Sequence, residues 1–431
     1  MLSSLSRWKE FIGSESSDQQ FTTLYGGGLD RQKKRYIKAL EQFGRIFGDA
    51  AVALISAPGR TELGGNHTDH QRGRVLAAAV TLDSVAAAAP SDAGLIRVYA
   101  EGFGMYTVDI GELAPIASEE GSSAAMIRGV AARLGAMGRR IGGFDALITS
   151  DVPRGSGLSS SASFEILVCT ILNHFYNNDE IPATEEALAG QYAENRYFGK
   201  PCGLMDQLTS ASGGVVSIDF HDPDQPVLEK IPGALFENEY KMCIVNSGGS
   251  HADLTADYAD IPKEMSAVAA FFGQEALGGV RRDDFYRDLD RLRGKLPDRA
   301  LLRAMHFFAE DARAPLLAEA LKKGDAGAYL RLMRESGASS FTRLQNIFPG
   351  ADPAERGLSL ALSLSEELLG DRGAWRVHGG GFAGTIQAMA PLPLLGGYRR
   401  EMRRIFGNDC FYELALRPAG GHVMKTGDEV D

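Results

Sequence analysis

The sequence contains few cysteines and no long apolar segment. Its 431 residues include four cysteines, at positions 169, 202, 243 and 410, which lie far apart and form no C-x-x-C pair. A disulfide framework and a structural zinc site are therefore not expected, and this cysteine usage is typical of a reduced, cytoplasmic protein. There is no run of about eighteen apolar residues and no apolar core of a signal peptide, so neither a membrane span nor export is expected.

Positive charge is also scarce. The chain has 45 Lys and Arg residues against 56 Asp and Glu residues, which gives a net charge of −11. This excess argues against nucleic acid or an anionic membrane as a partner, but it is compatible with a local basic pocket for a phosphate. The chain length favours two domains, and we expect a monomer.

The distribution of apolar residues predicts an α+β fold in two halves. Residues 1–29 are polar and are interpreted as an N-terminal extension. Strands and helices then alternate through residues 30–230, and the proline-containing stretch 221–233 is interpreted as a boundary or a long turn. Residues 231–431 are predicted to form the second domain, which carries a helical insertion at about 257–330.

The segment from Gly59 to Gly73 combines four glycines, two arginines, two histidines and two carboxylates directly after a strand predicted at Ala51–Ala57. An apolar core does not need this mixture. Such a mixture is needed in a turn that binds a small polyol, because each hydroxyl group requires a well-oriented polar or charged partner. The segment therefore predicts a binding site for a sugar-like molecule.

A second polar segment extends from Pro153 to Ser163. Its proline and glycines predict a turn after a strand, and three consecutive serines, residues 159–161, begin an apolar helix. Free N–H groups, hydroxyls and the positive end of a helix dipole form an anion site. One serine is enough to cap a helix, so three of them favour a phosphate site. It is not a Walker A loop, since no Gly-Lys-Ser/Thr follows.

Two carboxylates can complete this site. Asp206 falls in the first turn of a predicted helix, where the dipole favours its ionised form. By itself this position is compatible with simple stabilisation of the helix. However, a phosphate site needs a divalent cation, which binds oxygen ligands such as the hydroxyl of Ser161 and the carboxylate of Glu194. Asp206 would then remain for the acceptor hydroxyl.

These segments, in this order, resemble the galactokinase branch of the galactokinase, homoserine kinase, mevalonate kinase and phosphomevalonate kinase (GHMP) superfamily. Arg60–Asp69 is similar to G-R-V-N-L-I-G-E-H-T-D-Y, and Pro153–Ser163 is similar to P-L-G-A-G-L-S-S-S-A-S. Cys202–Gln207 resembles C-G-I-M-D-Q, and the glycine turn Gly379–Gly384 resembles G-A-G-F-G-G. The resemblance covers roughly residues 30–425.

The resemblance implies an N-terminal domain like ribosomal protein S5 domain 2, a ferredoxin-like C-terminal domain, and ATP and Mg²⁺ as cofactors. Arg60 and Asp206 would flank the reacting oxygen, and Ser161 and Glu194 would bind Mg²⁺. The implied sugar contacts are His67, Asp69, Gly203 and Tyr258, with Asn66 at the position of the family's Glu. The implied ATP contacts are Gly155, Gly157, Leu158, Ser159 and Ser160.

The expected reaction is transfer of the γ-phosphoryl group of ATP to the anomeric hydroxyl of a hexose, D-galactose giving galactose 1-phosphate. The sequence departs from the family at Asn66, which replaces a Glu, at Glu62, which replaces an Asn, and at His70, which replaces a Tyr. An amide would not repel a carboxylate on the sugar, so galacturonate is an alternative substrate, as is another hexose such as N-acetylgalactosamine. A sugar sensor without catalysis is an alternative from another class.

Overall fold

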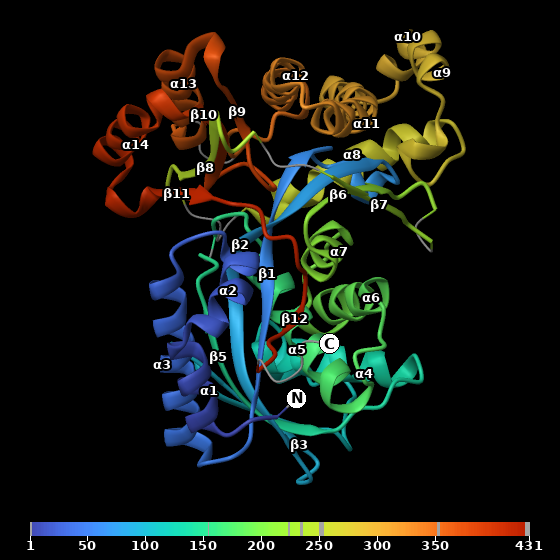
Figure 1. The fold of residues 1–431 in the computed structure, drawn as a ribbon. Helices are drawn as coiled ribbons and strands as arrows, with labels where there is room; N and C mark the ends of the chain where they lie inside the picture. Colours follow the sequence, from blue (N-terminus) through green and yellow to red (C-terminus); the bar gives the residue numbers. More distant parts are fainter. Residues whose placement is uncertain are drawn as a thin grey trace.

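The computed structural model describes residues 2–153, 155–222, 225–232, 236–249, 254–350 and 354–426. The chain forms two β-sheets, each covered by helices. In Figure 1, strands β3, β5 and β12 of the N-terminal sheet lie in the lower part, and its strands β6 and β7 lie in the upper part with the C-terminal sheet. This arrangement confirms the predicted α+β, two-domain fold. No helix in the described ranges is both long and apolar enough to cross a membrane.

The N-terminal sheet has the strand order β12-β1-β2-β5-β3-β4. In addition, β6 pairs with β2 on one side and with β7 on the other. All its neighbours are antiparallel except the pair β3 and β5. The strands are β1 (Ala53–Gly64), β2 (Arg74–Ser91), β3 (Leu95–Ala100), β4 (Gly104–Asp109), β5 (Gly143–Ser150), β6 (Val215–Asp219), β7 (Val227–Ile231) and β12 (His422–Val423).

Helices cover both faces of this sheet, with α1 to α3 on one side and α4 to α6 on the other (Figure 1). Successive residues of β1 alternate between the two cores: Leu54 packs with the first group of helices, and Ile55 with the second. The helices of the second group, together with α7, are α4 (Ser123–Ala136), α5 (Ser160–Tyr176), α6 (Ala183–Ala193) and α7 (Met205–Ser212).

Residues 2–29 are folded onto the N-terminal domain rather than forming a polar extension. They contain α1 (Leu5–Gly13) and α2 (Asp18–Tyr25), which pack on α3 (Leu29–Phe47). Trp8 and Phe21 are fully buried, because each short helix turns its few apolar side chains to one face. This pattern is difficult to recognise in the sequence, because the polar residues of each helix outnumber its buried apolar residues.

The C-terminal sheet has the order β11-β8-β10-β9 and is antiparallel. Its strands are β8 (Tyr240–Asn246), β9 (Ala374–Val377), β10 (Thr385–Pro391) and β11 (Phe411–Leu414). Two helices, α13 (Gly357–Leu369) and α14 (Leu392–Phe406), pack on it. The predicted helical insertion contains α8 (Thr255–Phe271), α9 (Arg282–Arg287), α10 (Leu289–Arg293) and α11 (Asp298–Lys323), and α12 (Ala326–Ser339) follows on from it.

The boundary between the halves differs from the expected one in two ways. Strand β7 lies inside the stretch 221–233, so this stretch extends the first sheet instead of only connecting two domains. The chain then returns at its C-terminus: Leu416 forms a bridge with Val80, and β12 pairs with β1. Residues 416–426 therefore belong to the N-terminal sheet, a long-range pairing that local sequence patterns do not reveal.

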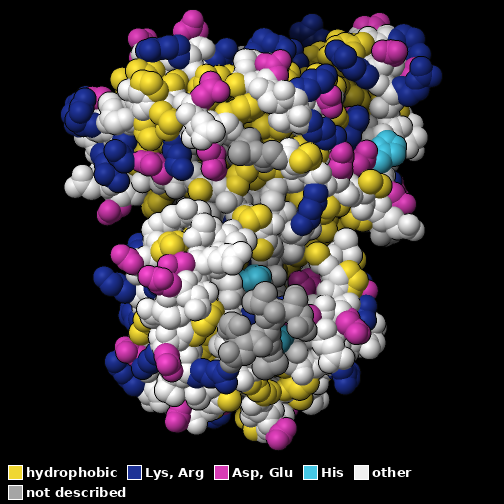
Figure 2. Space-filling view, in the orientation of Figure 1, with side chains coloured by type: hydrophobic (Ala, Val, Ile, Leu, Met, Phe, Trp, Pro, Cys, Tyr) yellow, Lys and Arg dark blue, Asp and Glu magenta, His cyan; other side chains and the backbone are white. Residues whose placement is uncertain are grey.

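The visible face of the molecule carries charges of both signs. In Figure 2, Lys and Arg side chains are intermixed with Asp and Glu side chains over both the upper and the lower part. No single sign of charge dominates this face.

Candidate functional site

The first half of the polar segment Gly59–Gly73 belongs to strand β1, which extends into the site. The sequence suggested a turn beginning at Gly59, but β1 continues to Gly64, and the turn follows it. The pairing with β2 shifts register between Pro58 and Arg60 and again between Glu62 and Gly64. Such bulges re-aim side chains next to active sites, and here one of them lies directly before Arg60.

Arg60 joins the sugar-type motif to the helix of Asp206. Its Nε lies 2.6 Å from Asp206 Oδ1, and its Nη2 lies 2.5 Å from Asp206 Oδ2, which is a bidentate ion pair. Ser159 Oγ donates to Asp206 Oδ2 at 2.7 Å. The three residues come from β1, from the first turn of α7 and from the cap of α5, so the structure brings together three motifs that are distant in sequence.

The serine loop lies directly against Arg60. The Arg60 N–H donates to Leu158 O at 3.0 Å, and its Nη1 donates to the carbonyl of Gly157. Gly157 has a φ of +70°, a conformation that favours glycine. At the start of α5, the hydroxyls of Ser160 and Ser161 have no hydrogen-bond partner among the residues that the structure describes, so they are available to a ligand.

Burial opposes ionisation of Asp206, but the charge of Arg60 and the hydrogen bonds from Arg60 and Ser159 outweigh it. The pKa of the Asp206 carboxyl therefore lies below its ordinary value, as the sequence predicted. The pKa of the Arg60 guanidinium is raised, because the attraction of Asp206 exceeds the effect of burial. The pair is thus a fixed charge pair at the edge of the serine loop.

Three of the expected sugar-binding residues are held by the glycine turn Gly379–Gly384. Asn66 Nδ2 donates to the carbonyl of Gly379 at 2.9 Å, His67 Nε2 lies 3.0 Å from that of Gly380, and Tyr258 donates to that of Gly381 at 3.0 Å. Three successive carbonyls therefore orient three side chains. The third glycine cluster acts as a scaffold for the sugar-type motif.

The geometry changes the role expected of Asn66. Its side chain is 1% exposed, and its Nδ2 group also donates to Glu62 Oε2 at 3.2 Å. Its Oδ1 accepts from Asn346 Nδ2 at 3.1 Å. Glu62 is itself paired with the buried Arg376. The amide is thus occupied inside the protein, so a supporting role fits Asn66 better than direct contact with a sugar.

Asp69 and Gly203 lie in direct contact. A Cβ atom built on Gly203 would be 1.8 Å from Asp69 Oδ2, so only glycine leaves room for this carboxylate. Burial raises the pKa of Asp69 to about 6, and the nearby charge of Asp206 adds to the shift. A buried carboxylate with few charged partners is well suited to accept hydrogen bonds from the hydroxyls of a neutral ligand.

Comparison with known proteins agrees with this site. Residues 41–90 match the galactokinase galactose-binding signature, and residues 121–214 match the N-terminal domain of the GHMP kinases. The chain thus carries a galactose-binding signature like that of the galactokinases and an N-terminal segment like that of the GHMP kinases. These matches indicate a sugar kinase of the galactokinase type.

Solved structures show the same fold. The Lactococcus lactis galactokinase complexed with galactose matches with a TM-score of 0.78 and 24% identity, over 90% of this chain and 99% of that one. The Methanococcus jannaschii mevalonate kinase matches with a TM-score of 0.59 and 18% identity, over 84% of this chain and 98% of that one. The D-glycero-D-manno-heptose 1-phosphate kinase from Bacteriodes thetaiotaomicron matches with a TM-score of 0.59 and 16% identity, over 86% of this chain and 99% of that one.

The expected metal ligand Glu194 lies in a buried polar cluster. Glu194 accepts from Lys200 Nζ at 2.8 Å and from Gln207 Nε2 at 2.9 Å, and the same amide group donates to Glu165 at 3.0 Å. In the described part of the chain, the buried atoms Glu165 Oε1 and Gln207 Oε1 have no hydrogen-bond partner, and no group of three or more His, Cys, Asp or Glu side chains forms a metal cage. These oxygen groups fit a magnesium ion whose remaining ligands are phosphate oxygens and water.

Sequence reasoning missed several residues of the site. Glu165 could have been found, because it follows Ser161 by four residues and so shares a helix face with it. Asn346, Arg376 and His378 carry no such local signal. They reach the site only because β9 and the segment after α12 pack against β1.

The contact between Gly203 and Asp69 leads to a prediction. Gly203→Ala is expected to raise the KM for the sugar roughly 10- to 100-fold, because the new Cβ displaces the Asp69 carboxylate. The KM for ATP should change little. Steady-state kinetics with each substrate varied in turn measure both values.

Gly396→Ala is the matched control, since a Cβ on this helical glycine meets no atom within 4 Å. An unchanged KM for the sugar in Gly203→Ala would contradict a sugar-binding role for this contact.

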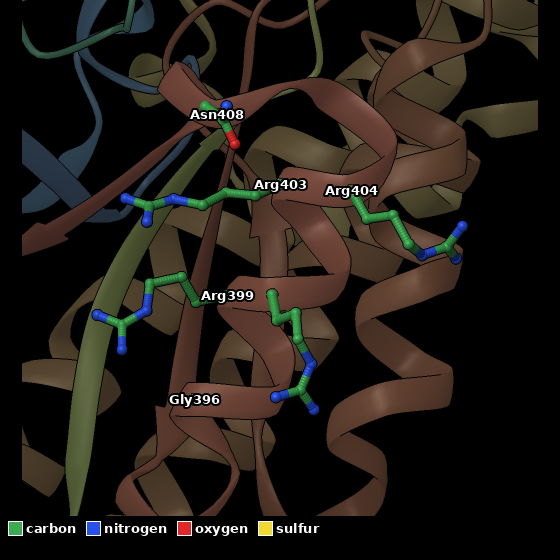
Figure 3. Close-up of a pocket in the computed structure, with 6 residues that line it drawn as sticks. Gly396, Arg399, Arg403, Arg404 and Asn408 are labelled. Atoms are coloured by element: carbon green, nitrogen blue, oxygen red, sulfur yellow. The ribbon is translucent and has the colours of Figure 1, made fainter.

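A surface hollow on the C-terminal domain is not part of this site. It has a volume of about 360 Å³ and is lined by residues of α14 and the turn after it. Arg399 and Arg403 extend from one side of α14, but Arg404 points the other way (Figure 3). Two of these arginines are already paired, Arg399 with Glu413 and Arg404 with Glu401. The arginines therefore do not converge on one ligand.

Proposed function

We propose that the chain transfers the γ-phosphoryl group of ATP to the anomeric hydroxyl of a galacto-configured hexose, with D-galactose as the first choice. The observation that carries this proposal is the meeting of Arg60, Asp206 and Ser159 between the sugar motif and the serine loop. This is the point at which an acceptor hydroxyl and a terminal phosphate would come together.

The binding roles follow from the position of each element. Asp69, Gly203, His67 and Tyr258 are proposed to surround the sugar, and Asn66 is proposed to support them. The backbone and hydroxyls of the loop at the start of α5 are proposed to hold the phosphates of ATP, through Gly155, Gly157, Leu158, Ser159 and Ser160. Ser161 and Glu194 are proposed to bind Mg²⁺, which would neutralise phosphate charge when bound.

Phosphoryl transfer has a loose transition state, so positioning and charge neutralisation account for most of the catalysis. Arg60 is held on one side by Asp206 and on the other by the Gly157 carbonyl, so its charge is fixed next to the loop. Because the pKa of Asp206 is low, its carboxylate is a weak base for a sugar hydroxyl. We propose that Asp206 orients the hydroxyl and accepts its proton late in the transfer.

The sugar remains the most open part of the proposal. The carboxylate that the family places at position 66 is here at position 62, where it is buried against Arg376. The side chain at position 66 therefore carries no negative charge, which is compatible with galactose and also with galacturonate. This arrangement keeps galacturonate as the second candidate.

An ATP-consumption assay with galactose, galacturonate, galactosamine and N-acetylgalactosamine tests the proposal. Turnover with galactose is expected, and the ³¹P NMR signal of the product should be split by a single proton, as for a phosphate at the anomeric carbon. Activity with galacturonate and none with galactose would overturn the first choice. Absence of ATP turnover with every sugar would favour a sensor.

A further inference from the structure

A chain of five buried polar residues connects the C-terminal sheet to the serine loop. Gln387 Nε2 lies 2.7 Å from Thr61 Oγ1, which lies 2.9 Å from His378 Nε2. His378 Nδ1 lies 3.3 Å from Thr385 Oγ1, and this hydroxyl donates to the carbonyl of Ser156 at 2.9 Å. All five residues are at most 3% exposed. The proposed reaction gives none of them a role.

The direction of this hydrogen-bond chain is fixed at both ends by carbonyls, which can only accept. Gln387 Nε2 also donates to the Glu62 carbonyl at 3.0 Å, so its amide group faces Thr61 as a donor. At the other end, the hydroxyl of Thr385 donates its hydrogen to the Ser156 carbonyl. Thr385 must therefore accept from His378 Nδ1–H, and Thr61 must donate to His378 Nε2.

The chain thus requires a neutral His378 with its hydrogen on Nδ1. Burial lowers the pKa of His378 to about 3, and the nearby charges of Arg60 and Arg376 lower it further, while the Ser156 carbonyl and the charge of Asp206 act in the opposite direction. The ring is therefore neutral at every pH at which the protein would work. The ring also packs closely against the serine loop, since a Cβ atom built on Gly157 would lie 2.7 Å from His378 Nδ1.

Two members of the chain, Thr61 and Ser156, adjoin residues that take part in the proposed reaction. Thr61 is the residue next to Arg60 on β1, and Ser156 is the residue next to Gly157 in the loop. Arg60 itself reaches the loop through the Gly157 carbonyl. We propose that His378 is a positioning residue, which fixes the serine loop against the strand of Arg60 through the imidazole and the two threonines. The purpose of this link rests on the proposed function.

Binding of the non-hydrolysable analogue AMPPNP, measured by calorimetry, tests the link without turnover. Thr385→Val keeps the shape of the side chain but removes the hydrogen bond to Ser156, so affinity should fall about tenfold. Affinity for the sugar should stay within about twofold, since the hydroxyl of Thr385 bonds to His378 and Ser156 and, among the described residues, to none of the segment Gly59–Gly73. Thr385→Ser, which keeps the hydroxyl, should restore nucleotide affinity.

Thr170→Val is the matched control, because Thr170 is also buried and its hydroxyl, among the described residues, donates only to Ile166 O within its own helix. If Thr385→Val lowers nucleotide affinity no more than Thr170→Val does, the link has no positioning role and the proposal is overturned.

The hydrogen position gives a second readout that does not depend on activity. Selective ¹⁵N-histidine labelling, with the signal assigned through His378→Asn, should show a neutral ring protonated at Nδ1 between pH 5 and 9. Protonation at Nε2 would overturn the proposed chain. A wild-type protein that shows this Nδ1 signal but binds no AMPPNP would contradict the proposed function and leave the hydrogen-bond chain intact, so the two failures are distinguishable.

Discussion

Asp206→Asn is expected to lower kcat by about 10²- to 10⁴-fold, the range typical of a lost proton acceptor at a reacting group. Asparagine fills the same space and can still accept from Ser159, but it cannot balance the charge of Arg60 or take up the hydroxyl proton. The KM for the sugar should change much less than kcat. Steady-state kinetics of the purified variant with the accepted sugar measure both values.

The pH dependence gives a further check on Asp206. Because its pKa lies below the ordinary value, the wild-type carboxylate is ionised throughout pH 5–9. The kcat of the wild type should therefore show no acid limb from this group in that range, and the loss in Asp206→Asn should be the same at each pH. A loss of only a few-fold would show that Asp206 is dispensable and would contradict its assigned role.

Asp311→Asn is the matched control for Asp206→Asn. Asp311 forms a similar two-bond pair with Arg74, through Arg74 Nε at 3.2 Å and Nη2 at 2.6 Å, and it makes no hydrogen bond to the described residues of the serine loop. Its kcat should stay close to that of the wild type. A comparable loss in both variants would indicate a general effect of breaking such a pair.

Asp83→Asn is expected to lower the free energy of unfolding by about 3–5 kcal/mol, the cost of leaving buried charges without their partner. The Asp83 carboxylate is fully buried and accepts from Tyr25 at 2.7 Å, from Arg35 at 2.6 Å and from Arg417 at 2.5 Å. An amide of the same size takes away the counter-charge of Arg417 and leaves Arg35 with the longer pair to Asp151, at 3.4 Å. Urea denaturation followed by circular dichroism measures the change.

Asp145→Asn provides the comparison for a pair at the surface. Asp145 binds Arg97 at 2.6 Å and 2.5 Å, but the Arg97 side chain is 43% exposed. Its loss should cost less than about 1 kcal/mol, because water screens and replaces an exposed ion pair. Equal destabilisation in the two variants would show that burial of Asp83 does not matter, and would contradict the prediction.

The parts of the site that depend on local signals could be predicted from the sequence. The glycines and serines after β5 predicted an anion loop at a helix start, and the structure has α5 beginning at Ser160. Asp206 was predicted in the first turn of a helix with a lowered pKa next to Arg60, and both features are confirmed. In these cases, the residues that determine the outcome are few and belong to recognisable motifs.

The parts that depend on distant partners could not be predicted. The burial of Asn66 depends on Asn346 and on the Gly379 carbonyl, which are 280 and 313 residues away. The role of His378 likewise depends on hydroxyls that two other strands supply. No periodicity or spacing specifies which of several polar residues will meet across a domain boundary, because that depends on how whole elements pack.

The return of residues 416–426 to the first sheet also constrains the order in which the protein can fold on the ribosome. Asp83 emerges early in synthesis, but its partner Arg417 is made more than three hundred residues later, as its pairing across 334 positions shows. Strand β12 and the buried Met424 arrive later still. The N-terminal domain therefore cannot reach its final structure until residues 416–426 have been made, which is after all four strands of the C-terminal sheet.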